Sequence, residues 1–198
     1  MNTKLLLATR NPHKTEELIM LLGKSFKIAD LSTLPQAPEV EETGATFLEN
    51  AILKAVATSR IADGLVLADD SGLEVDALGG RPGVHSARFA GPDSDDRANN
   101  LRLLAELSGI DAARRTGRFR CVVVLARNGD VLANFDGAVD GRLLEEPRGA
   151  AGFGYDPLFV PEGYAQSFAE LGPEVKNELS HRARAMEQAG AWLRTARL

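Results

Sequence analysis

Short apolar runs alternate with amphipathic stretches in the first half of the chain, which predicts strands alternating with helices. Residues 5–8 are typical of a short buried strand, and a second strand is expected near residues 26–29. Between them, residues 14–22 are predicted to form a helix, because their leucines recur on one face. Pro12 suits the first turn of this helix, and Gly23 suits its end.

A second helix and a third strand follow. Thr46 and Glu49 form a capping-box pattern, so we expect a helix over residues 47–62. Residues 65–68 are typical of a buried strand, which we expect to end abruptly at Asp69-Asp70-Ser71-Gly72. A glycine-rich loop and a helix over residues 93–107 are predicted beyond this point.

The clearest strand pattern lies in the second half of the chain, at residues 119–126. Asn128-Gly129 is typical of a two-residue hairpin turn, so a returning strand is expected over residues 131–139. We expect a flexible loop over residues 149–154 and a last helix over residues 183–198. These elements predict an α/β fold with a mixed sheet, because a hairpin adds antiparallel pairing to strands that are joined through helices.

The composition of the 198-residue chain fits a single domain, built as one body or as two small lobes without a separable linker. Hydrophobic residues make up 44% and the net charge is −5, which argues against disorder. The acidic balance also argues against a protein that coats nucleic acid, because such proteins carry a basic excess. A small phosphorylated ligand needs only a few local cations and is not excluded.

The sequence favours a cytoplasmic protein. Cys121 is its single cysteine, so no intrachain disulfide can form, which fits a reducing compartment. No apolar run approaches the roughly 20 residues that a membrane helix needs. The apolar run near the start of the sequence is too short for the core of a signal peptide.

Several well-known catalytic patterns are missing from the sequence. It has no G-x-x-x-x-G-K-[ST] phosphate loop, no G-x-G-x-x-G fingerprint, no H-E-x-x-H and no G-x-S-x-G. The single cysteine excludes a cysteine-rich zinc site. Catalytic chemistry would therefore come from polar clusters at the ends of the predicted elements.

Two such clusters follow predicted strands. Residues 9–14 lead into a helix, where backbone N–H groups, Arg10 and Lys14 could cradle an anion; an ordinary capped helix is the alternative. Asp69 and Asp70 follow a buried strand, at the sheet edge where ligands usually bind. Mg²⁺ prefers oxygen ligands such as carboxylates. We expect only one of the two aspartates to reach the metal, because neighbouring strand side chains point to opposite faces.

Further segments carry functional side chains, each with an ordinary structural alternative. Residues 39–42 hold three glutamates, which could supply a second metal ligand or form a solvated loop. Residues 152–157 combine aromatic rings with glycines, which could stack on a base or anchor the loop to the core. Residues 176–182 bring cations to the start of the last helix, and Asn50 and Lys54 share one helix face.

In their order and spacing, these motifs resemble those of the inosine/xanthosine triphosphate pyrophosphatases, over almost the whole chain. The matching segments are Ala8-Thr9-Arg10-Asn11 with Lys14, Glu41-Glu42-Thr43-Gly44, Glu49-Asn50-Ala51 with Lys54-Ala55, Ala68-Asp69-Asp70-Ser71-Gly72-Leu73, Pro82-Gly83-Val84-His85-Ser86-Ala87-Arg88, Gly152-Phe153-Gly154-Tyr155-Asp156-Pro157 and Ser180-His181-Arg182. A common form of the family has glycine where Arg10 and His13 stand, while Thr9, Asn11 and Lys14 stay in register.

The resemblance implies an elongated mixed sheet with flanking helices, two lobes around a nucleotide cleft, and a homodimer. It implies Mg²⁺-dependent hydrolysis of ITP, dITP and XTP to the monophosphate and pyrophosphate, which cleanses the nucleotide pool. By position, Glu41 and Asp70 would hold Mg²⁺, and Asp70 would accept a proton. The implied substrate contacts are Thr9, Arg10, Asn11, Pro12, His13, Lys14, Lys54, Ser71, Phe153, Gly154, Tyr155, Asp156, Lys176, His181 and Arg182.

In this interpretation water attacks a phosphorus atom at the α–β bridge, and pyrophosphate leaves. Asp70 either takes the water proton directly or orders the water through the metal, and both roles are open. Donors such as Arg182 would favour the 6-oxo group of hypoxanthine and xanthine over the amino group of adenine. Two other functions are also open: a pyrophosphatase for other modified nucleotides, and a module that binds purine triphosphates without turnover.

Overall fold

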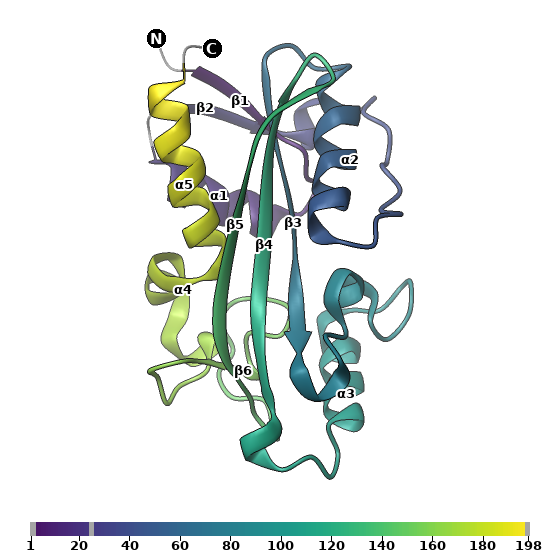
Figure 1. The fold of residues 1–198 in the computed structure, drawn as a ribbon, viewed down its shortest axis with the longest axis vertical. Coiled ribbons are helices and arrows are strands. Elements are labelled where there is room, and N and C mark those ends of the chain that lie inside the picture. Colours follow the sequence, from purple (N-terminus) through teal and green to yellow (C-terminus); the bar gives the residue numbers. More distant parts are fainter. Residues whose placement is uncertain (1–2, 24–25, 197–198) are drawn as a thin grey trace. The chain divides into compact units, whose positions relative to one another are not determined.

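The computed structural model describes residues 3–23 and 26–196, which form a mixed sheet of six strands with helices beside it (Figure 1). The strand order is β2-β1-β3-β4-β5-β6. The strands are β1 Thr3–Leu7, β2 Phe26–Asp30, β3 Leu65–Val75, β4 Thr116–Arg127, β5 Asp130–Leu143 and β6 Phe159–Pro161. β1 pairs in parallel with β2 and β3, and β5 pairs antiparallel with β6, so the predicted mixed α/β sheet is confirmed.

The helices begin and end with the local signals that the sequence carries. They are α1 Pro12–Leu22, α2 Phe47–Ser59, α3 Asp96–Glu106, α4 Phe168–Leu179 and α5 His181–Thr195. Pro12 opens α1, and Gly23 ends it with a φ of 64°. Thr46 and Glu49 form the predicted capping box of α2.

The predicted end of the third strand is wrong. β3 does not stop at residue 68 but continues through Asp69 and Asp70 to Val75. An acidic pair inside a buried strand is unfavourable unless the carboxylates have partners. Both carboxylates have charged or hydrogen-bonding partners in this fold, so the strand can continue through them.

Among the strands and α-helices of the described residues, β6 and α4 were not predicted. In α4, Gly172 has a non-helical φ of 80° and Pro173 follows it, which interrupts the helical pattern. α2 ends at Ser59, before the predicted residue 62. The predicted end of the last helix at Leu198 lies outside the described residues.

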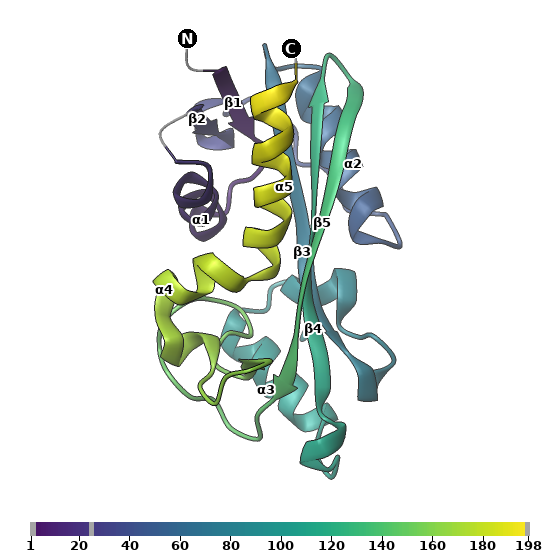
Figure 2. The same cartoon turned by 60° about the vertical axis from the view of Figure 1, so that its left-hand side comes forward.

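The chain divides into two compact units. Unit 1 comprises Met1–Asp70, Cys121–Gly137 and Arg182–Leu198, and unit 2 comprises Ser71–Arg120 and Ala138–His181. In unit 1, α1 and α5 lie on one face of the strands and α2 lies on the other (Figures 1 and 2). Alternate strand residues pack with α1 and α5 in one buried core, among them Leu5, Leu7, Leu65, Leu67, Val123 and Leu125.

Aromatic rings form the centre of unit 2. The ring centroids of Phe119 and Phe159 are 4.7 Å apart, and those of Phe159 and Phe168 are 5.5 Å apart. Leu103 and Leu107 of α3 join the same buried cluster. These contacts link α3 and α4 to the strands of unit 2.

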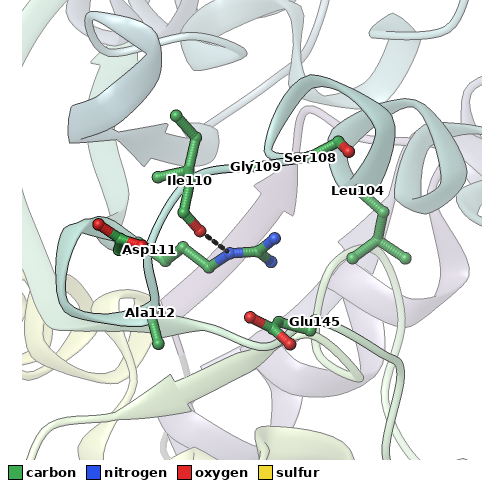
Figure 3. A pocket seen from close by; sticks show the side chains of 8 residues that line it. Leu104, Ser108, Gly109, Ile110, Asp111, Ala112 and Glu145 are labelled. Carbon is green, nitrogen blue, oxygen red and sulfur yellow. Dashed lines mark hydrogen bonds between the residues drawn. The ribbon is translucent and has the colours of Figure 1, made fainter.

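Arg115 braces the end of α3 in unit 2. Its buried guanidinium donates hydrogen bonds to the carbonyl oxygens of Leu107, Ile110 and Leu144, at 2.9, 3.1 and 2.9 Å. Figure 3 shows the adjoining cavity of about 460 Å³, lined by Leu104, Ser108, Gly109, Ile110, Asp111, Ala112, Arg115 and Glu145. Because its acceptors are backbone carbonyls, Arg115 serves the fold by satisfying groups that a helix end leaves open.

Within the described part of the chain, no helix is both long enough and apolar enough to cross a membrane.

Gly141 on β5 and Gly190 on α5 provide a matched test of packing. A Cβ atom at position 141 would lie 2.4 Å from the carbonyl oxygen of Val160 and 2.5 Å from Cζ of Phe159. A Cβ atom at position 190 would meet only a flexible guanidinium nitrogen of Arg194, at 3.3 Å. We expect Gly141→Ala to lower the free energy of unfolding by about 1–3 kcal/mol, because β5 and β6 must move apart.

Gly190→Ala should raise the free energy of unfolding by roughly 0.5–1 kcal/mol, because alanine forms helix better than glycine. Urea unfolding followed by circular dichroism measures both variants against the unchanged protein. A Gly141→Ala protein as stable as the unchanged chain would contradict the close β5–β6 approach.

Candidate functional site

The segment between β1 and α1 is held by its own side chains. Asn11 caps α1, because its Oδ1 accepts hydrogen bonds from the backbone N–H groups of His13 and Lys14 at 3.0 and 3.3 Å. The backbone N–H of Asn11 donates to Oγ1 of Thr9 at 3.1 Å. Pro12 is exposed at the first helical position. The segment therefore begins a capped helix, and its predicted grip on phosphate stays a prediction.

Arg10 connects this segment to the loop that precedes α2. Its guanidinium donates to the carbonyl oxygen of Ala37 at 2.6 Å. Ala37 is buried and lies a few residues before the acidic stretch at Glu41 and Glu42. Arg10 thus helps to fix the path of a loop that carries candidate metal ligands.

Asp69 is a buried carboxylate between two cations. Its Oδ2 lies 3.0 Å from Nζ of Lys14 and 3.2 Å from Nη2 of Arg182, and Asp69 and Arg182 are almost fully buried. Arg182 also forms an ion pair with Glu17 of α1. Burial alone would raise the pKa of Asp69, but Lys14, Arg182 and Lys54 hold that pKa well below its usual value. Asp69 therefore stays ionised.

The carboxylate of Asp70 is bonded to other residues than that of Asp69, and both of these residues come from α2. Its Oδ1 accepts a charged hydrogen bond from Nζ of Lys54 at 3.0 Å, and its Oδ2 accepts one from Nδ2 of Asn50 at 3.3 Å. Lys54 also contacts Glu42, with its Nζ 2.7 Å from Oε1. Lys54 is thereby shared between two carboxylates.

The two neighbouring aspartates have opposite pKa shifts. Burial raises the pKa of Asp70, Lys54 and Lys14 counteract it, and Glu42 adds to the rise. For Lys54, burial by itself lowers the pKa, but Asp70, Asp69 and Glu42 outweigh it, so the pKa is raised and the ammonium stays charged. Adjacent acids whose surroundings push their pKa values apart are typical of sites that combine charge stabilisation with proton transfer. Of the two carboxylates, Asp70 is the one with the raised pKa, and its predicted role as proton acceptor stays a prediction.

The loop of residues 39–44 brings one glutamate to this cluster. Glu42 contacts Lys54, whereas the side chain of Glu41, the predicted metal ligand, is exposed. Within the described ranges no group of three or more His, Cys, Asp or Glu residues has metal-binding geometry. Mg²⁺ is often held by one or two carboxylates together with substrate phosphates, so the oxygens of Asp70 and this acidic loop fit its chemistry.

The glycine-aromatic loop of unit 2 is organised around Asp156. Its Oδ2 lies 2.6 Å from Nζ of Lys176 and accepts a hydrogen bond from the backbone N–H of Phe153 at 2.9 Å. Lys176 and Asp156 are both buried, and Nζ of Lys176 lies 4.4 Å from the centroid of the Phe153 ring. A Cβ atom at Gly152 would come within 2.1 Å of Oδ2 of Asp156, so only glycine fits this turn.

The other predicted base contacts of unit 2 have structural partners. Tyr155 is buried and its hydroxyl donates to the carbonyl oxygen of Ser86 at 2.8 Å, while Gly154 is bonded to both Asp96 and Asn100. His181 is buried and stacks on Phe119 with ring centroids 4.9 Å apart. Ser71 follows Asp70 on β3 and is half-buried. Their predicted nucleotide contacts stay predictions.

The structure thus brings one group of predicted residues together in unit 1. Lys14, Lys54 and Arg182 surround Asp69 and Asp70. Three further residues of this group are not among the implied catalytic, metal or substrate contacts: Glu17, Glu42 and Asn50. Asn50 carried a usable signal, because it lies four residues before Lys54 on one helix face. Glu42 belongs to the acidic stretch that could supply a second metal ligand, whereas Glu17 gave no signal apart from its charge.

The Ham1 family model matches residues 5–192 of the chain. Proteins named dITP/XTP pyrophosphatase are similar over nearly the full length. The one from Methylococcus capsulatus is 50% identical over 199 residues, with 98% of each chain covered. The one from Bacillus subtilis is 45% identical over 184 residues, covering 92% of this chain and 93% of that protein.

Solved structures agree with these matches. A HAM1 protein from Coxiella burnetii has a TM-score of 0.88 and 38% identity, covering 98% of this chain and all of that one. A nucleoside-triphosphatase / dITP/XTP pyrophosphatase from Mycobacterium abscessus has a TM-score of 0.76 and 43% identity, covering 94% of this chain and 98% of that one. With the family model matched over residues 5–192 and identities near one half, the chain belongs to the Ham1 family.

Proposed function

We propose that this chain hydrolyses deaminated purine nucleoside triphosphates, namely dITP, ITP and XTP, to the monophosphate and pyrophosphate. The observation that carries the proposal is the pair of adjacent buried aspartates with different partners: Asp69 lies between Lys14 and Arg182, and Asp70 is bonded to Lys54 and Asn50. Relatives near 50% identity over almost their whole length are named dITP/XTP pyrophosphatase, which supports dITP and XTP as substrates, and the family resemblance supports ITP. A triphosphate and a nucleophilic water are the reactants that such a site can serve.

In this proposal Asp70 accepts the proton of the attacking water. Its raised pKa makes it a better base than an exposed aspartate, and Asn50 and Lys54 hold both of its oxygens. Lys14 and Lys54 supply positive charge beside it, which stabilises the negative charge that develops on the phosphoryl oxygens. Thr9, Arg10, Asn11, Pro12 and His13 are proposed to complete the triphosphate contacts.

The chain is proposed to use Mg²⁺, held by Asp70 and Glu41. When bound, Mg²⁺ supplies charge neutralisation and a Lewis acid for the phosphate oxygens. Glu42 forms an ion pair with Lys54, which keeps the Lys54 ammonium beside Asp70. In this proposal the acidic loop therefore supplies a metal ligand, Glu41, and also positions Lys54.

Base recognition is proposed for a second set of residues: Ser71, Phe153, Gly154, Tyr155, Asp156, Lys176, His181 and Arg182. The half-buried ring of Phe153 offers a face for stacking, and Lys176 and Asp156 keep that ring in place. Hydrogen-bond donors that face position 6 of the purine would bind the oxo group of hypoxanthine and xanthine. Adenine carries an amino group there, so these donors would be left unpaired.

We further infer a homodimer in the cytoplasm. The family resemblance supports the dimer. The single cysteine, Cys121, is a buried free thiol whose pKa burial raises to about 12, which suits a protein that stays in a reducing compartment.

Asp70→Asn tests the proposed base. The amide keeps the size of the side chain but is a far weaker base, so we expect kcat with dITP and Mg²⁺ to fall by roughly 10²–10⁴-fold. Asp140→Asn, at a carboxylate whose side chain is 63% exposed, serves as the control and should turn over like the unchanged protein. Pyrophosphate release is the measurement, and circular dichroism verifies the fold. Turnover by Asp70→Asn at the unchanged rate would remove Asp70 from the proton-transfer step.

The cleaved bond is tested by phosphorus NMR with dITP and Mg²⁺. We expect dIMP and pyrophosphate in equal amounts, because attack occurs at the α–β bridge. Release of orthophosphate would show that a different bond is cleaved. Binding of dITP with no product at all would support a binding module instead of an enzyme.

The assembly is tested by sedimentation equilibrium of the purified protein. We expect a mass twice that of the chain across the micromolar concentration range. A single species with the mass of one chain over that range would exclude the homodimer.

A further inference from the structure

We propose that Asn50 is a positioning residue that fixes both Asp70 and the acidic loop before α2. This inference rests on the proposed function, because it assigns Asn50 a part in the same reaction. Asn50 lies on the second turn of α2 with no exposed surface. A buried amide in the first half of a helix is unfavourable unless its polar atoms are bonded elsewhere, so its partners indicate why it is there.

The amide of Asn50 makes two hydrogen bonds with different groups. Its Nδ2 donates to Oδ2 of Asp70 at 3.3 Å, and its Oδ1 accepts the backbone N–H of Gly44 at 2.8 Å. An ionised carboxylate only accepts and a backbone N–H only donates, so these two partners define which end of the amide faces which group. Asparagine satisfies both at once, aspartate would satisfy only Gly44, and leucine would satisfy neither.

Asn50 acts together with the next turn of α2. Lys54, four residues on, binds Oδ1 of Asp70, so one helix holds both oxygens of this carboxylate. A carboxylate bonded at both oxygens cannot rotate freely about its last side-chain bond. The capping box of Thr46 and Glu49 fixes the start of α2 one turn earlier, and so sets the position of Asn50.

The loop before α2 is tied to the same residues. Gly44 is bonded to Asn50, and Glu42, two residues earlier, is bonded to Lys54. The approach at Gly44 is close, because an added Cβ atom would lie 2.7 Å from Oδ1 of Asn50 and 2.6 Å from Cβ of Glu49. The acidic loop and Asp70 are therefore held by the same two side chains of α2, and Asn50 is the uncharged one of the two.

The experiment compares Asn50→Asp and Asn50→Leu with the unchanged protein. We expect both variants to lower kcat for dITP by about 10²-fold with little change in KM, because Asn50 orients the base and not the nucleotide. Hydrogen exchange of the Gly44 amide separates the two bonds. It should stay slow in Asn50→Asp, which keeps the acceptor, and become fast in Asn50→Leu.

Asn99→Asp is the matched control. Asn99 is also a buried amide, whose Oδ1 accepts the backbone N–H of Ala90 and whose Nδ2 donates to the carbonyl oxygen of Ala87. We expect this variant to lose stability but to keep kcat. An Asn50→Asp protein with unchanged kcat, or with a raised KM and unchanged kcat, would overturn the proposal.

Two further outcomes are decisive. If neither Asn50 variant folds, the unchanged protein still gives the answer: the Asn50 side-chain amide and the Gly44 N–H should both exchange slowly, and fast exchange of either one overturns the proposal. If the unchanged protein does not hydrolyse dITP, the proposed function fails, while the exchange data still test the anchor itself.

Discussion

The central constraint of this structure is that two adjacent carboxylates lie inside a buried strand. Asp69 and Asp70 are both nearly inaccessible to solvent, and neither could be buried as an anion without compensation. Because neighbouring side chains of a strand point to opposite faces, each aspartate needs its own partners. Lys14 and Arg182 serve Asp69, while Asn50 and Lys54 serve Asp70.

This arrangement links the fold of unit 1 to its chemistry. The helices on one face of the strands, α1 and α5, bring the two cations that keep Asp69 ionised. The helix on the other face, α2, brings one cation and one neutral amide to Asp70, so burial prevails and the pKa of Asp70 rises. The pKa of Asp69 is therefore lowered and that of Asp70 is raised, because the groups that surround the two carboxylates differ.

Sequence reasoning predicted many of the elements because their signals are local. The capping box of α2, Pro12 at the start of α1, the Asn128-Gly129 turn and the apolar run of β4 each depend on a few neighbouring residues. It failed where distant partners override the local pattern. A doubled acid normally ends a strand, but β3 continues because its acids are paired. A glycine and a proline hid α4, although Ser167 and Glu170 form a capping box there.

Three features could be predicted from the sequence: the mixed α/β class, the order of the polar motifs and the resemblance to a nucleotide pyrophosphatase family. These depend on residue type and spacing along one chain. Three features became visible only in three dimensions: the opposite pKa shifts of Asp69 and Asp70, the contact of Glu42 instead of Glu41 with Lys54, and the link that Asn50 makes between Asp70 and Gly44. The physical reason is that desolvation and hydrogen bonding depend on neighbours in space, and these come from segments far apart in the sequence.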